Sequence, residues 1–251
     1  MVVFTCHDDF ESMMTCIYDA WSARLGHSNI KLMTEPIEEP ELFCQYRHVD
    51  PDPEKYKKVI RSIRSKISEN AYQDVYRAAM HWNPEKLDII YRFLVLGFAL
   101  GSQVTRMLGD PYVSALFELD RKVTNESHQF REFIRFSRLN DQVLFSLIQP
   151  KCNILTLIAS HFSDRMPSEN WLIADKKRRM ALVHPADQHY FLTPVTPQEL
   201  AHMEEARKGD TYSSLWKAFF NAVGVEARAN YRCQRNFLPL WYRKDMTEFS
   251  G

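Results

Sequence analysis

Glycine and paired cysteine are both scarce in this sequence. Only 7 of its 251 residues are glycine, and neither GxxxxGKS/T nor GxGxxG, the loops that hold phosphates in common nucleotide-binding folds, occurs. The 5 cysteines are odd in number and none lies at CxxC spacing, which excludes a disulfide framework, an iron–sulfur site and a zinc ribbon of the usual kind. We therefore expect buried or half-buried thiols in a reducing compartment.

Recognisable catalytic and metal-binding motifs are also missing. No G-x-S-x-G nucleophile elbow occurs, and the 9 histidines show neither HExxH nor another ligand spacing, so we expect no metal and no cofactor. The most apolar stretch, residues 93–100, is far shorter than the roughly 20 residues that span a bilayer. The first residues contain no cationic signal region. These absences predict a cytoplasmic protein without a membrane segment.

Charge is balanced overall but unevenly distributed. Lys and Arg number 32, and so do Asp and Glu. Residues 1–52 hold 3 basic against 10 acidic side chains, residues 53–150 hold 15 against 11, and residues 151–251 hold 14 against 11. An acidic beginning followed by basic parts suggests functional polarity, although packing of one part against the other would also explain it.

Capping signals predict many helices. Asp52-Pro53, Asn83-Pro84, Asp110-Pro111 and Thr196-Pro197 each place a capping side chain before a proline of a first helical turn. An N-terminal helix is expected between a cap at Asp8 and a stop at Gly26. Further helices are expected over residues 53–66, 69–81, 84–107, 111–134, 154–163, 197–208 and 211–236. Strands are expected over residues 2–6, 42–49, 135–139, 143–148, 171–174, 180–183 and 190–192.

The order of these elements predicts the fold class. Strands and helices are mostly segregated along the chain, which is typical of α+β proteins. We expect a single, mostly helical α+β domain over residues 1–251, with a possible helical subregion over 53–134. Its small antiparallel sheet is expected to be built largely from residues 135–195.

The last part of the sequence mixes cations with aromatic rings and lacks carboxylates over residues 229–243. The cations and rings are Arg228, Arg232, Arg235, Arg243, Lys244, Tyr231, Phe237, Trp241 and Tyr242. Helical spacings of four and three would align the first three arginines in one stripe. Cations beside stacking surfaces suit nucleic acid, with Tyr231 or Trp241 stacking on bases. In the alternative, the stripe pairs with the acidic residues Glu35, Glu38, Glu39 and Glu41.

A second basic element follows Asp175 in an expected hairpin turn. It consists of Lys176, Lys177, Arg178 and Arg179. Four cations cannot all be buried without a large free-energy cost, so they point into solvent or toward an anion. Nucleic acid is one such anion, and an ordinary solvated surface is the alternative.

Four residues are candidates for catalysis. His161, Asp164 and Arg165 lie near the end of one expected helix, and Asp175 ends an expected strand. If these side chains converge in a cleft, they could act on a base or nucleotide. Otherwise His161 is a helix-terminal histidine satisfied by the backbone.

Several motifs of the C-terminal half form a distinctive set: Arg135–Leu139, His161–Met166, Trp171–Arg178, and Trp216–Phe220 continuing through Glu226, Arg228, Asn230, Gln234, Pro239 and Tyr242. This set resembles a bacterial family of unknown function described as DNA repair or DNA metabolism proteins. The resemblance implies a radical S-adenosylmethionine protein as partner. Some members are fused to a uracil-DNA glycosylase-like domain, whose motifs this chain lacks. Met166 and Leu240-Trp241 depart from the pattern, and the resemblance assigns no catalytic residue.

Three hypotheses follow. The first is a nucleic-acid-binding accessory protein in DNA repair or modification that acts on DNA with a partner enzyme. The second is an enzyme acting on a base or nucleotide, and the third is a protein–protein adaptor without direct DNA contact. The sequence distinguishes neither single- from double-stranded DNA nor one oligomeric state from another.

Overall fold

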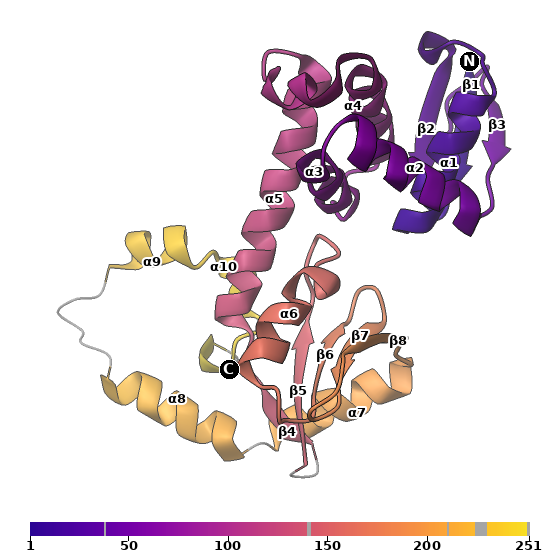
Figure 1. Ribbon diagram of the computed structural model, residues 1–251. Helices are drawn as coiled ribbons and strands as arrows, with labels where there is room; N and C mark the ends of the chain where they lie inside the picture. The colour runs from indigo at the N-terminus through magenta and orange to yellow at the C-terminus, as the bar shows by residue number, and fades with distance from the viewer. Residues whose placement is uncertain (38, 140–141, 210, 224–229, 250–251) are drawn as a thin grey trace. The chain divides into compact units, whose positions relative to one another are not determined.

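The computed structural model describes residues 1–37, 39–139, 142–209, 211–223 and 230–249 (Figure 1). The α+β class is confirmed, with 56% helix and 16% strand. Contacts divide the chain into two compact units: unit 1 comprises residues 1–125 and 151–153, and unit 2 comprises residues 126–150 and 154–251. These units are regions of dense contact, and the single domain expected over residues 1–251 stays a prediction.

Unit 1 contains a parallel sheet that the sequence analysis did not predict. Its strands are β1 (Val2–Cys6), β2 (Ile30–Thr34) and β3 (Gln45–His48), in the order β2-β1-β3. Helix α1 (Phe10–Ser22) leads from β1 toward β2 and begins after Asp9, which accepts a hydrogen bond from the Ser12 N–H at 2.9 Å. The expected cap at Asp8 is therefore wrong by one residue.

The further helices of unit 1 are α2 (Pro53–Lys66), α3 (Glu69–Ala79), α4 (Lys86–Leu100), two 3-10 helices (His27–Asn29 and Gly101–Arg106) and the first part of α5 (Pro111–Phe133). The one helix expected over 84–107 is α4 followed by a 3-10 helix, and α4 begins two residues after Pro84, with no side-chain hydrogen bond at its cap. Asp52 caps α2 by accepting hydrogen bonds from the N–H groups of Glu54 and Lys55. Gly97 of α4 lies against the end of the Ile67 side chain, so a larger residue at this position would displace that side chain.

The stretch Lys86–Arg106 is long and apolar enough to cross a membrane by length and composition alone. Core helices share that property. In this structure α4 buries Leu87, Ile90 and Leu94 completely within the protein.

The sheet of unit 2 is mixed. Its strands are β4 (Ser137–Leu139), β5 (Val143–Ile148), β6 (Trp171–Asp175), β7 (Met180–His184) and β8 (Phe191–Pro194), paired in that order. β5 and β6 are parallel, with α6 (Leu155–Arg165) as the crossover, and the other pairs are antiparallel. The expected sheet over 135–195 is thus present, but it is not wholly antiparallel because a helix joins β5 to β6.

Two helices cover opposite faces of this sheet (Figure 1). On one face Phe145, Leu147 and Ala174 form a core with Met203 of α7 (Pro197–Lys208). On the other, Trp171 lies edge-on to Phe162 of α6, with ring centroids 6.1 Å apart. The capping box between Thr196 and Glu199, expected from the sequence, is confirmed.

Short helices complete unit 2. They are α8 (Thr211–Val223), α9 (Tyr231–Phe237), α10 (Leu240–Arg243) and a 3-10 helix (Thr247–Phe249). The one helix expected over 211–236 is therefore two helices, and residues 224–229 between them lie outside the described part of the chain. Tyr242 of α10 is buried against Phe130 and Phe133 of α5, with ring centroids 5.3 and 5.6 Å away.

The cysteines form no disulfide among the residues that the structure describes. Cys6, Cys16 and Cys152 are buried and Cys44 is half-buried, as expected, whereas Cys233 is exposed on α9.

Candidate nucleic-acid interface

Helix α9 carries two of the three arginines of the predicted stripe. Arg232 and Arg235 are exposed, three residues apart, beside Tyr231 with 72% and Phe237 with 77% of its surface exposed. Asn230 caps the helix by accepting the Cys233 N–H at 3.0 Å. Neither arginine forms an ion pair with a carboxylate of the described residues. α9 is thus an accessible basic and aromatic element.

The remaining arginine of the stripe, Arg228, lies outside the described residues, as does Glu38 of the acidic segment. Glu35 of that segment binds His48 at 2.8 Å, and Glu41 pairs with Lys31. Both of these carboxylates therefore have a partner within unit 1.

Trp241, the second proposed stacking residue, is half-buried on α10. Its ring lies 4.5 Å from that of Tyr242 and 6.1 Å from that of Phe130, centroid to centroid. The Lys244 ammonium lies 5.3 Å from the Trp241 ring. Trp241 therefore packs against the protein itself, and Tyr231 is the more accessible ring.

Asp175 organises the basic turn between β6 and β7. Its carboxylate is fully buried and accepts hydrogen bonds from the N–H groups of Lys177 at 2.9 Å and Arg178 at 3.2 Å. The Arg178 guanidinium also donates to it at 2.7 Å. Asp175 thus holds the turn, which accounts for its burial without a catalytic role.

The cations of the turn divide into two pairs. Lys177 and Arg179 are exposed, whereas Lys176 and Arg178 are half-buried. The Lys176 ammonium lies 3.6 Å from Glu204 and 4.0 Å from Asp245. Burial raises the pKa of Asp245, and the Lys176 charge opposes that change. Lys177 and Arg179 are therefore the cations of the turn that can meet an external anion.

The catalytic candidates do not gather at one place. His161, Asp164 and Arg165 lie in the last turns of α6, next to the beginning of β6, where Met166 accepts the indole N–H of Trp171 at 3.3 Å. Asp175 is at the other end of β6, about 13 Å away along the strand. Burial, followed by the charges of Arg131 and Arg165, lowers the pKa of His161. This separation leaves Asp175 out of any site at the end of α6.

A groove on α8 is a site that the sequence analysis missed. Exposed aromatic and apolar residues line one side of the helix at helical spacing: Tyr212, Leu215, Trp216 and Phe219. Their exposed fractions lie between 40% and 60%, which is large for such side chains. Their spacing was the available signal, but spacing alone does not tell an exposed stripe from a buried one.

Two arginines of unit 2 lie over rings of this stripe. The guanidinium carbon of Arg138 is 5.0 Å from the Tyr212 ring centroid, and that of Arg135 is 5.8 Å from the Trp216 ring. Arg135 also forms an ion pair with Glu248 at 2.8 Å, and the Trp216 indole N–H donates to the same carboxylate at 3.2 Å. Arg138 is exposed and, unlike Arg135, forms no ion pair with a carboxylate of the described residues.

No cluster of three or more histidine, cysteine, aspartate or glutamate side chains suited to a metal ion occurs in the part of the chain that the structure describes.

Comparison with known protein families identifies the family of this chain. Residues 84–248 match the model of DUF4130, a domain of unknown function. Because the match covers more than half of the chain, the chain belongs to the DUF4130 family. A search of the curated proteins found no match.

Proposed function

We propose that this member of the DUF4130 family binds nucleic acid through unit 2, as an accessory protein of DNA repair or modification that acts with a partner enzyme. The pair of arginine–ring contacts on α8 carries the proposal: Arg138 over Tyr212 and Arg135 over Trp216. A guanidinium can meet a phosphate while the neighbouring ring offers a face to a base.

The choice of DNA and of the partner rests on the resemblance of the C-terminal motifs to DNA repair or DNA metabolism proteins. That resemblance makes a radical S-adenosylmethionine protein the proposed partner. The thiol of Cys233, which is exposed and forms no disulfide, favours the reducing cytoplasm as the place of action.

Single-stranded DNA fits the exposed rings better than a duplex does. Bases in a duplex are already stacked on one another, whereas an unpaired base can stack on Tyr212, Trp216 or Tyr231. The backbone of the strand would be attracted by exposed cations of unit 2 such as Arg138, Lys177, Arg179, Arg232 and Arg235.

The affinity of the wild-type protein for a single-stranded oligonucleotide is expected to fall steeply with salt. If about four to six cations meet phosphates of a single strand, the log–log slope should be about −3 to −4. Fluorescence anisotropy across a salt series measures this slope, with a duplex of the same sequence for comparison. A flat response at low salt, or tighter binding of the duplex, contradicts the proposal.

Variants of the α8 groove are expected to weaken this binding. Tyr212→Ala should lower the affinity about 5- to 30-fold by removing a stacking surface. Arg138→Gln should make the salt slope shallower by about 1. Tyr190→Ala is the matched control for the ring, because Tyr190 is an exposed tyrosine of the same unit. Lys208→Gln, at a lysine paired with Glu205, is the control for charge. Equal losses in the variants and their controls would reject the groove.

A docking surface for a partner protein is the second candidate. Leu215 and Phe219 add 60% and 54% exposed apolar side chains to the same stripe, and exposed apolar patches often bind proteins. This adaptor role is favoured if the partner enzyme co-purifies after nuclease treatment while oligonucleotide binding is absent.

A further inference from the structure

Helix α2 of unit 1 is strongly basic. It carries one carboxylate, Glu54, and six cations: Lys55, Lys57, Lys58, Arg61, Arg64 and Lys66. Lys55, Lys57 and Arg64 form ion pairs with carboxylates. Lys58, Arg61 and Lys66 form none with any residue that the structure describes. The helix therefore presents three uncompensated charges.

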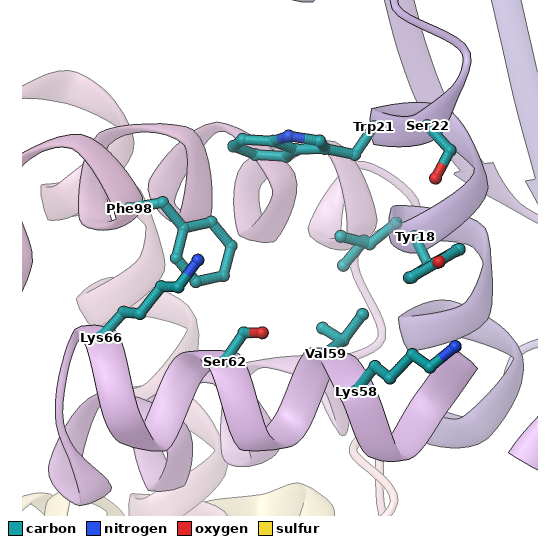
Figure 2. A pocket seen from close by; sticks show the side chains of 9 residues that line it. Tyr18, Trp21, Ser22, Lys58, Val59, Ser62, Lys66 and Phe98 are labelled. Carbon is teal, nitrogen blue, oxygen red and sulfur yellow. The ribbon is translucent and has the colours of Figure 1, made fainter. Parts of the chain in front are cut away.

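A pocket of about 260 Å³ lies between α1, α2 and α4 (Figure 2). Three aromatic side chains line it: Tyr18, Trp21 and Phe98. Ile17 and Val59 are its most buried lining residues, with 2% and 6% exposure. No carboxylate belongs to its lining. The pocket is thus aromatic inside and has no negative charge to repel an anion.

Trp21 presents the face of its indole to this pocket. Figure 2 shows the ring lying across the cavity from Ser62 of α2. Phe98 meets the indole at 86° with centroids 5.4 Å apart, and His27 lies 4.7 Å from it. These neighbours hold the ring in place, while 37% of the residue remains exposed. A planar ligand could stack on this fixed surface.

Lys58 and Lys66 flank the pocket. Together with Ser62 they are spaced four residues apart on α2, so the three side chains share one face of the helix. Lys66 lies 5.9 Å from the Phe98 ring and Lys58 lies 5.8 Å from the Tyr18 ring. The two lysines are about 12 Å apart along the helix axis, one at each end of the cavity.

We propose that this pocket binds a nucleotide, with the base stacked on Trp21 and a phosphate held by Lys58 or Lys66. A purely apolar ligand would leave the two lysines and Ser62 without a role, and inorganic phosphate would leave the three rings without one. A nucleotide uses both. The proposal concerns unit 1 and does not depend on the interface proposed for unit 2.

The test uses the full chain, titrated calorimetrically and by tryptophan fluorescence with the four deoxynucleoside 5′-monophosphates, thymidine, inorganic phosphate and a short single-stranded oligonucleotide. At least one monophosphate should bind about fivefold or more tightly than thymidine or phosphate. Either Lys66→Gln or Lys58→Gln, whichever removes the lysine that holds the phosphate, should weaken binding roughly 3- to 10-fold. Lys57→Gln is the matched control, since Lys57 is on the same helix, outside the pocket and paired with Glu54.

Two further variants locate the ligand. Trp21→Phe keeps a stacking ring, so affinity should stay within about threefold while the part of the fluorescence change that arises from the indole disappears. Ser62→Phe fills the cavity and keeps both lysines, so binding should be lost in a protein whose thermal unfolding confirms that it is folded.

The outcomes distinguish a free nucleotide from one nucleotide of a strand as the ligand. Binding of free monophosphates supports a nucleotide pocket. Binding of the oligonucleotide alone also supports it, as a site for one nucleotide of a strand, if Ser62→Phe weakens that binding. Retained binding in Ser62→Phe, losses in Lys58→Gln and Lys66→Gln that are both no larger than the loss in Lys57→Gln, or no binding of any nucleotide overturns the proposal. Losses caused by Tyr212→Ala report on unit 2 and leave this pocket untouched.

Discussion

Lowering the pH from 7 to 4 is expected to reduce the free energy of unfolding by about 3 kcal/mol through His81 alone. This side chain is 2% exposed and follows α3. Its Nδ1 accepts the Asn83 N–H at 2.9 Å, and its Nε2 has no hydrogen-bond partner in the described residues. Burial, then the charges of Lys122 and Lys86, lowers the pKa of His81 to about 4.

The sign follows from proton binding by the two states. An unfolded histidine takes up a proton near pH 6.5, whereas the folded His81 remains neutral until about pH 4. Between these values the unfolded state binds more protons, so stability falls as the pH falls. Above about pH 6.5 both states are neutral at this position and the contribution is complete.

His81→Asn isolates this effect. Asparagine keeps an acceptor for the Asn83 N–H and does not titrate. Urea denaturation at several pH values should show the stability of the wild type falling by about 3 kcal/mol more than that of the variant between pH 7 and 4. Hydrogen exchange of α3 amides would locate the loss in unit 1. Parallel pH curves for the two proteins would show that folding does not lower the pKa of His81.

Trp171→Ala is expected to destabilise unit 2 by about 3–5 kcal/mol. Trp171 is 1% exposed at the beginning of β6 and stacks on His184, with centroids 4.9 Å apart and rings 2° from parallel. Its indole N–H donates to the carbonyl of Met166. Removing the ring leaves a cavity between the sheet and α6 and takes the indole donor from the Met166 carbonyl, which keeps only the Glu169 N–H at 3.5 Å.

Trp216→Ala is the matched control for this variant. Trp216 is 40% exposed, so its loss should cost about 1 kcal/mol or less. The same substitution should weaken oligonucleotide binding, which Trp171→Ala does not affect while the protein is folded. Chemical denaturation followed by circular dichroism compares the two variants. Similar losses of stability would mean that the stripe on α8 packs as a core does.

Local signals explain what the sequence predicted well. Asp52-Pro53 and Thr196-Pro197 begin helices because capping and the fixed φ of proline act within one turn. Pairing between distant segments was harder to predict. The parallel register of β5 and β6 depends on α6 covering one face, and periodicity within each strand does not reveal the direction of its neighbour.

In the candidate sites, too, local features were predicted and features that depend on distant residues were not. Exposure of Arg232, Arg235, Lys177 and Arg179 agrees with their prediction as surface cations. Lys176 is instead drawn toward Glu204 and Asp245, which are 28 and 69 residues away in sequence. The pocket beside Trp21 combines residues from three helices. No local pattern predicts such a combination, because it depends on how the helices pack.

The two edge strands of the unit 2 sheet, β4 and β8, limit how this unit can associate with other chains. An outer strand offers unpaired backbone groups to which another chain can add by β-augmentation. Here β4 is only 3 residues long, and β8 ends at Pro194, which has no N–H to donate. Both borders therefore provide few backbone groups for intermolecular pairing. Assembly of this unit with another macromolecule is expected to rely on side chains, and fibrillar growth through its sheet is disfavoured.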